Sequence, residues 1–307
     1  MGISRREFLK RTAVAAGTVT FPGLIAEMFG EKKMATRPFG KTGYHASIYT
    51  VGTAEIPNNQ DSVDALRALF AGGVNMIDTA PSYMGTQSES TVGRAIEGRR
   101  KGLWISTKTL ERSADGAYRE INESLGRLKS DWIDLLQVHA VNDQGTLDAV
   151  LRKGGAIEGI ERAKNEGLVR NIGITGHTRP EVILNAMKAY PFVSILVPIS
   201  ALDAHINDFA TEVVPYANSH GVAVVGMKSL KGIERATPGQ FRAEEFVRYT
   251  LSQPISTLNL GLRISDEAAQ NLKTILGFKP MSKSEMSELE TRAKQHANVN
   301  TLWWKKT

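Results

Sequence analysis

The hydrophobic positions of this chain form a repeating pattern from residue 47 onward. A short, almost continuous apolar run is followed by a polar loop and then by an amphipathic stretch with helical spacing. Continuous apolar runs are typical of parallel strands covered on both faces. The predicted strands are Ser47–Gly52, Val74–Asp78, Leu103–Lys108, Ile133–His139, Val169–Thr175, Val193–Val197, Val222–Met227 and Thr257–Gly261.

The amphipathic stretches between these runs predict helices. Glycines at Gly72-Gly73, Gly167 and Gly221 end three of them just before the next strand, a position where glycine is favoured. A further helix, Lys283–Ala297, follows the last strand. The other predicted helices are Ser62–Ala71, Ser88–Glu97, Ala117–Leu128, Ala156–Glu166, Pro180–Lys188 and Phe209–His220.

Strands that alternate with helices predict an α/β fold, specifically a (β/α)8 TIM barrel. A doubly wound sheet would show a glycine-rich turn after its first strand, and Gly52-Thr53-Ala54-Glu55 lacks that fingerprint. Gly40-Lys41-Thr42 resembles the end of a phosphate loop, but Ala35 stands where its first glycine is required. We therefore expect a hairpin turn there, and a single domain over residues 34–307 with an N-terminal hairpin and an extra C-terminal helix.

Residues 1–33 resemble an export signal. Ser4-Arg5-Arg6-Glu7-Phe8-Leu9-Lys10 is similar to the bacterial twin-arginine motif, and a weakly apolar stretch follows from Thr12 to Phe29. An amphipathic N-terminal helix is the alternative. The stretch contains Pro22 and falls short of the roughly 20 strongly apolar residues of a membrane span. We expect the twin-arginine (Tat) machinery as a partner, a periplasmic or otherwise exported protein, and membrane association only if the segment is retained as an anchor.

Composition narrows the class of protein. The 307 residues are 41% hydrophobic and 23% charged, as in soluble globular proteins, and contain no cysteine. Disulfides, thiolate catalysis and cysteine metal sites are therefore excluded, and no metal site is predicted. The net charge is +6, but residues 1–33 carry six basic and three acidic residues, which leaves +3 for the rest. Because no basic stripe with interleaved aromatics remains, nucleic acid is not an expected partner.

Ionisable residues stand at the ends of three consecutive predicted strands. The second strand ends in Asp78 and is followed by Tyr83, the third ends in Lys108 and the fourth in His139. Taken alone, the aspartate could cap a turn, the lysine could be solvated and the histidine could be structural. In this type of barrel, however, the chemistry lies at the C-terminal ends of the strands. Their combination therefore predicts an active site.

These motifs resemble those of the aldo-keto reductases. The resemblance rests on Asp78-Thr79-Ala80-Pro81-Ser82-Tyr83, on Ser106-Thr107-Lys108 and on Asp134-Leu135-Leu136-Gln137-Val138-His139, and it extends from Arg37 to Asn271. It implies an NAD(P)-dependent oxidoreductase acting on an aldehyde, ketone or sugar.

The same resemblance implies a role for each of the four residues. Tyr83 would be the general acid, Lys108 would lower its pKa, Asp78 would hold Lys108, and His139 would orient the carbonyl. An ammonium about 4 Å from a phenol favours phenolate by about 4 kcal/mol at an effective dielectric of about 20.

The resemblance also implies a cofactor surface that uses NADP or NAD, with the choice left open. Three positions depart from the family pattern: Thr175-Gly176, then His177, replaces a Ser-Asn pair, Ile199 with Ser200 replaces a stacking tyrosine, and Glu267 replaces an arginine that grips the 2′-phosphate. Arg263 could compensate for Glu267. The implied contacts are Gly52 and Thr53 after the first strand, Thr175, Gly176, His177 and Ser200, then Met227, Lys228, Ser229 and Leu230 at the pyrophosphate, and Gly261, Arg263, Glu267 and Asn271 at the adenosine.

Two other functions are compatible with this pattern. Export makes recycling of a diffusible cofactor difficult, which suggests a nucleotide-binding sensing or regulatory subunit without turnover. A Schiff-base lyase using Lys108 is the other, although it gives Tyr83 no role. The short loop Ala140–Gly145 suggests an open pocket, and Trp303-Trp304 could contact substrate or pack against the final helix.

Overall fold

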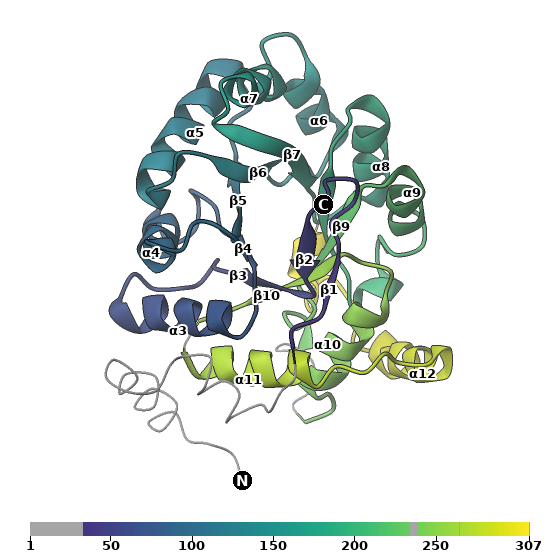
Figure 1. Cartoon of the computed structure of the whole chain (residues 1–307). Helices are drawn as coiled ribbons and strands as arrows, with labels where there is room; N and C mark the ends of the chain where they lie inside the picture. The colour runs from purple at the N-terminus through teal and green to yellow at the C-terminus, as the bar shows by residue number, and fades with distance from the viewer. Residues whose placement is uncertain (1–32, 234–238, 264, 307) are drawn as a thin grey trace, which may run out of the picture.

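The computed structural model describes residues 33–233, 239–263 and 265–306. Within these residues, eight parallel strands form a closed barrel, which confirms the predicted (β/α)8 fold (Figure 1). The strands follow one another around the barrel as β3 (Tyr49–Gly52), β4 (Met76–Asp78), β5 (Trp104–Thr109), β6 (Ile133–Val138), β7 (Val169–Thr175), β8 (Ser194–Pro198), β9 (Ala223–Met227) and β10 (Thr257–Gly261), which pairs with β3.

Helices surround the barrel. The structure confirms the predicted helices and adds three in segments where the sequence had predicted none, α6, α10 and α11. The predicted C-terminal helix is present as α12 and ends at Lys294. The helices are α3 (Gln60–Ala71), α4 (Gln87–Ile96), α5 (Ala114–Leu128), α6 (Gln144–Leu151), α7 (Ala156–Asn165), α8 (Pro180–Ala189), α9 (Val213–His220), α10 (Ala243–Ser252), α11 (Ser265–Leu276) and α12 (Lys283–Lys294).

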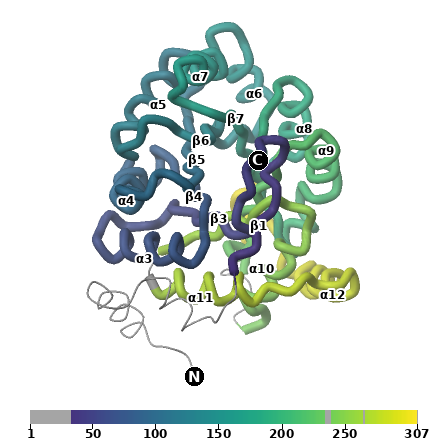
Figure 2. Tube along the Cα trace, in the orientation of Figure 1, coloured from purple at the N-terminus to yellow at the C-terminus, as the bar shows by residue number. Residues whose placement is uncertain are grey.

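The predicted hairpin is present and covers one end of the barrel. Strands β1 (Thr36–Pro38) and β2 (His45–Ser47) pair antiparallel ahead of the barrel (Figure 2). The rings of Phe39 and Tyr44 lie 5.5 and 4.5 Å from that of Trp104 in β5, so the hairpin packs on the barrel interior. Gly40, with φ +56°, fits closely because a Cβ there would lie 2.6 Å from Gly221 O. Because the hairpin covers this end, the candidate active site lies at the opposite end, where the strands terminate.

Several predicted boundaries differ from the structure by two or more residues, and two of these differences have identifiable reasons. The helix predicted from Phe209 begins at Val213, because Pro215 lacks a backbone N–H and is tolerated in a first turn but not in a helix interior. The first barrel strand begins at Tyr49 and not at Ser47, because Ser47 pairs with Thr36 in the hairpin.

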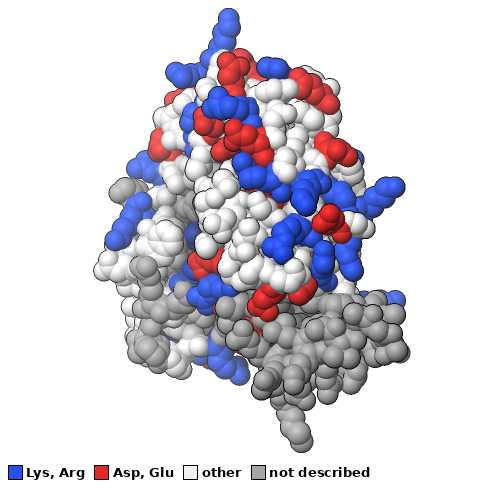
Figure 3. Space-filling view, turned by 90° about the vertical axis from the view of Figure 1, so that its left-hand side faces the viewer, with Lys and Arg blue, Asp and Glu red and all other residues white. Residues whose placement is uncertain are grey.

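The predicted twin-arginine segment lies, except for Lys33, outside the described residues. In the part of the chain that is described, no helix has both the length and the apolar character needed to cross a membrane. Figure 3 shows the side of the barrel covered by α4 and α5, where acidic and basic side chains are interspersed. Ion pairs such as Lys129–Glu97 and Arg127–Glu123 contribute to this mixture.

Candidate active site

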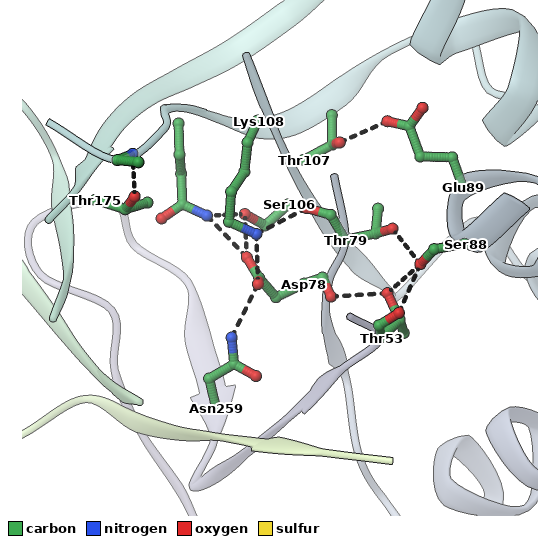
Figure 4. A network of polar contacts seen from close by, with 12 residues as sticks. Thr53, Asp78, Thr79, Ser88, Glu89, Ser106, Thr107, Lys108, Thr175 and Asn259 are labelled. Carbon is green, nitrogen blue, oxygen red and sulfur yellow. Dashed lines mark hydrogen bonds and ion pairs between the residues drawn. The ribbon is translucent and has the colours of Figure 1, made fainter. Parts of the chain in front are cut away.

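A buried carboxylate lies at the end of β4. Asp78 is 3% exposed, and its Oδ2 accepts hydrogen bonds from Lys108 Nζ at 2.6 Å and from Asn259 Nδ2 at 2.9 Å (Figure 4). Its Oδ1 accepts from Gln137 Nε2 at 2.8 Å and from Ser106 Oγ at 3.2 Å. These side chains come from the four strands β4, β5, β6 and β10. In the parallel register of β4 and β5, Asp78 is aligned with Ser106. Hydrogen-bond donors therefore occupy both oxygens of this carboxylate.

The ammonium of Lys108 is fixed by two acceptors. Besides Asp78 it donates to Thr79 O at 2.8 Å, and the side chain is 1% exposed. Burial lowers the pKa of Lys108, but the opposing effects of Asp78 and Tyr83 outweigh burial and raise it. A protonated amine is not a nucleophile, so this geometry speaks against the Schiff-base lyase hypothesis.

Tyr83 lies next to this ion pair. Lys108 Nζ is 4.8 Å from the centroid of the Tyr83 ring, and that ring meets His139 edge-on at 6.0 Å. Burial raises the pKa of Tyr83 and, with the charge of Asp78, outweighs the lowering by Lys108. The expectation of a net lowered pKa is therefore not met in this state. The phenol is protonated, as a proton donor must be at the start of a reduction.

Two histidines face the same rim and are uncharged. Burial, with the nearby cation Lys108, lowers the pKa of His139 to about 2. Burial and Lys228 lower the pKa of His177 to about 3. Among the described residues, the buried Nδ1 of His139 has no hydrogen-bond partner. A neutral imidazole can donate one hydrogen bond without introducing a charge, as the sequence analysis expected of His139.

The backbone at this rim adopts an unusual conformation. Ala140 after β6 and Lys228 after β9 have left-handed φ angles of 55° and 61°, and Met84 beside Tyr83 has φ 50°. Residues other than glycine rarely adopt this conformation, and they cluster at functional sites where the surrounding structure enforces them. Two of these three residues, Ala140 and Lys228, follow strand ends that carry candidate residues.

The hydroxyl groups predicted to contact cofactor at the first and fifth barrel strands are used internally. Thr53 Oγ1 donates to Asp78 O at 3.0 Å and accepts from Ser88 at 2.7 Å. Gly52 has no room for a side chain, because a Cβ would lie 2.3 Å from Asn259 Oδ1. Thr175 Oγ1 accepts from Ala140 N at 2.8 Å. These residues therefore shape the rim, and Gly52 and Thr53 can offer a ligand chiefly their backbone groups.

Packing explains the first departure from the family pattern. A Cβ on Gly176 would lie 2.6 Å from Ile183 Cδ1 of α8 and 2.8 Å from Val141 O. An asparagine is therefore excluded by the backbone itself. His177, the next residue, donates its backbone N–H to Asn142 Oδ1 at 2.7 Å, which fixes its position beside His139.

The second departure lies beside a buried ion pair. Ser200 donates to Asp203 Oδ2 at 2.6 Å, and Ile199 is buried in the core. Asp203 also accepts from Trp304 Nε1 at 3.1 Å and lies 3.3 Å from Lys305 Nζ. The hydroxyl of Ser200 is thus engaged by Asp203 in this state.

Trp303 and Trp304 have different surroundings: Trp304 is packed in the core and Trp303 is exposed. Trp304 packs with Leu289 and Ala293 of α12, as one of the two predicted alternatives stated. Trp303 is 43% exposed at the mouth, where Lys228 Nζ lies 4.9 Å from its ring centroid.

The predicted cofactor residues after β9 and β10 lie on one side of the mouth. Ser229 is 1% exposed, and its Oγ has no partner within the described residues. Glu267 accepts from the backbone and guanidinium of Arg263, at 2.7 and 2.9 Å, so these two side chains are paired. Asn271 Nδ2 donates to Gly261 O at 3.1 Å and holds the end of β10. Met227 ends β9 and Leu230 packs against the core.

Sequence reasoning missed the residues that surround Asp78. Gln137 and Asn259 are polar residues inside apolar strand runs, Leu135–Val138 and Thr257–Gly261, and that contrast is the signal that could have found them. Ser106 was part of a quoted motif but had no assigned role.

Comparisons with known proteins agree with this site. Residues 49–238 match the model of the Aldo/keto reductase family. L-galactose dehydrogenase of Arabidopsis thaliana is 29% identical over 64% of this chain and 66% of its own length, just under two thirds. Oxidoreductase YqkF of Bacillus subtilis, described as uncharacterized, is 26% identical over 73% of this chain and 84% of its own length. An aldo-keto reductase from Klebsiella pneumoniae, solved with NADPH, shares the fold with a TM-score of 0.71 at 19% identity, over 86% of this chain and 95% of that one.

The chain therefore belongs to the aldo/keto reductase family, a family of oxidoreductases.

Proposed function

We propose that this protein transfers hydride between NADP or NAD and a carbonyl or alcohol substrate, an aldehyde, ketone or sugar. The observation that carries the proposal is the buried Asp78–Lys108 pair facing the Tyr83 phenol, beside a neutral His139. The family membership and the NADPH held by the Klebsiella relative support it.

The residues at the mouth fit a nicotinamide dinucleotide. Ser229 Oγ is a buried hydroxyl without a partner in the described chain, and Lys231 and Arg263 supply cations on the β9 and β10 side. When bound, the nicotinamide supplies or accepts the hydride.

The side chains of this protein would handle the proton. Tyr83 gives its phenolic proton to the carbonyl oxygen in the direction of reduction and takes it back in oxidation. Lys108 stabilises the phenolate that forms, and Asp78 holds the ammonium in place. Neutral His139 donates a hydrogen bond that orients the carbonyl. The raised pKa of Tyr83 in this state means that the phenol begins protonated.

Purified protein mixed with NADPH or NADH and a panel of aldehydes, ketones and sugars tests the proposal. We expect loss of the reduced nicotinamide with at least one carbonyl. Mass spectrometry of the denatured protein would show in parallel whether a nicotinamide is retained, and which one. Tight binding with no oxidation by any carbonyl of the panel would contradict turnover and favour the sensing or regulatory subunit.

We also propose that residues 1–33 direct export by the twin-arginine pathway, on the strength of the Arg5-Arg6 motif. Changing both arginines to lysine is expected to keep the protein in the cytoplasm with its enzyme activity intact. Fractionation of cells that express each form is the measurement. Equal export of both forms would refute the proposal.

A further inference from the structure

Lys228 at the mouth contacts two tryptophan rings, whereas its basic neighbours Lys231 and Arg263 pair with carboxylates. Lys228 follows β9 with φ 61°, and its ammonium lies 4.9 Å from the Trp303 ring centroid and 5.3 Å from that of Trp304. Both rings offer their faces to this cation. A left-handed residue other than glycine is strained, which indicates that the surrounding structure holds the backbone of Lys228 in this conformation.

The charge of Lys228 is not balanced by a direct partner. Across residues 33–233, 239–263 and 265–306, its ammonium forms neither a hydrogen bond nor an ion pair. Burial, together with Lys231, lowers the pKa of Lys228 to about 8, against the weaker opposing effects of Asp203 and Glu55. A partly buried cation without a counter-ion is costly, and a bound anion would remove that cost.

The other cations of this rim are paired with carboxylates. Lys231 pairs with Glu55 after β3, and Arg263 pairs with Glu267 at the start of α11. These pairs mark the side of the mouth where the resemblance places the phosphates and adenosine. The resemblance placed Lys228 there as well, but its ammonium leans toward the tryptophans near the ends of β7 and β8.

The side chains of the reaction centre lie near this lysine and the two tryptophans. Among the neighbouring charges, Lys228 has the largest effect on the pKa of His177, which it lowers, and it also lowers the pKa of His139. His177 and His139 are 6.4 Å apart, and His139 is 6.0 Å from Tyr83. The nearby carboxylates are already paired with lysines: Asp78 with Lys108, Asp203 with Lys305 and Glu55 with Lys231. The Tyr83–His139–His177 group is therefore close enough to Lys228 for its ammonium to act on both histidines.

We propose that the substrate carries a carboxylate as well as its carbonyl, and that Lys228 binds this carboxylate with Trp303 as the adjoining wall. This inference rests on the proposed function, since it names the substrate class of the same site. A carboxylate would accept a charged hydrogen bond from Lys228 while the carbonyl oxygen reaches Tyr83 and His139.

Two aldehydes that differ only in charge provide the test: 4-carboxybenzaldehyde and the methyl ester of the same acid. We expect kcat/KM to favour the carboxylate, and Lys228→Met to lower that preference by about 10-fold to 100-fold, the range of a charged hydrogen bond. Lys231→Met removes a neighbouring cation of the same size. It should weaken NADPH binding and leave the preference unchanged.

Benzoate binding followed by tryptophan fluorescence gives a readout that needs no turnover. We expect benzoate to change the emission of the wild-type protein and to bind Lys228→Met at least about 10-fold more weakly. An unchanged preference, or a Lys228→Met variant that loses NADPH affinity instead, would overturn the inference and assign Lys228 to the cofactor. If neither aldehyde reacts, the proposed function fails for these substrates, and the benzoate titration alone decides on Lys228.

Discussion

Replacement of Tyr83 by Phe is expected to lower kcat for carbonyl reduction by about 10²-fold to 10⁴-fold, the usual contribution of a general acid. The substitution removes one hydroxyl group and keeps the ring that lies between Lys108 and His139. Because the phenol and not the ring transfers the proton, the dissociation constant of NADPH should hardly change. Steady-state kinetics and a fluorescence titration with NADPH measure the two quantities.

Tyr118→Phe is the matched control for this experiment. The same hydroxyl is lost on the surface of α5, where Tyr118 donates to Glu166 far from the mouth. We expect its kcat to equal that of the unchanged protein. A Tyr83→Phe variant with full kcat would exclude Tyr83 as the acid and would leave His139 as the remaining donor near the carbonyl position.

The second large effect concerns the buried Asp203–Lys305 ion pair beside Trp304. Lys305→Met is expected to lower the free energy of unfolding by about 3–5 kcal/mol, because removal of one partner leaves a buried charge without its counter-ion. Lys305 and Asp203 are 0% and 1% exposed, and Nζ also donates to Asn207 O at 2.8 Å. Burial raises the pKa of Asp203 even in the presence of the lysine. Urea unfolding measures the change.

A double variant and a surface control separate the buried charge from lost packing. Asp203→Asn combined with Lys305→Met removes both charges, and we expect it to regain a large part of the lost stability. Lys164→Met breaks an exposed pair with Glu161, at 42% and 37% exposure, and should cost less than about 1 kcal/mol. Equal losses for Lys305→Met and Lys164→Met would show that the buried pair contributes little.

The barrel could be predicted because its signals are local. Each strand is a continuous apolar run, so the pattern reports burial on both faces without any knowledge of neighbours. The four candidate residues could be predicted for a related reason: parallel strands bring their C-terminal ends to one rim. Asp78, Lys108 and His139 therefore had to lie near one another once the barrel was assumed.

The details that could not be predicted depend on contacts between distant segments. Asn259 reaches Asp78 across 181 positions of sequence, and no local pattern encodes that hydrogen bond. The net pKa of Tyr83 depends on how deeply the ring is buried, which a pairwise estimate from Lys108 alone omits. Helix α6 was missed because its first residues were read as loop, although Asp143 caps it by accepting from Thr146 N.

The close packing at Gly176 restricts the mutational routes open to this protein. The Ser-Asn pair that is common in the family cannot be restored here by a single substitution, because any side chain at residue 176 meets Ile183 and the backbone of Val141. A smaller residue at 183 would relieve one contact, but the carbonyl of Val141 would have to move as well. Residue 176 therefore cannot offer an amide side chain to a nicotinamide unless Ile183 and the Val141 carbonyl both shift.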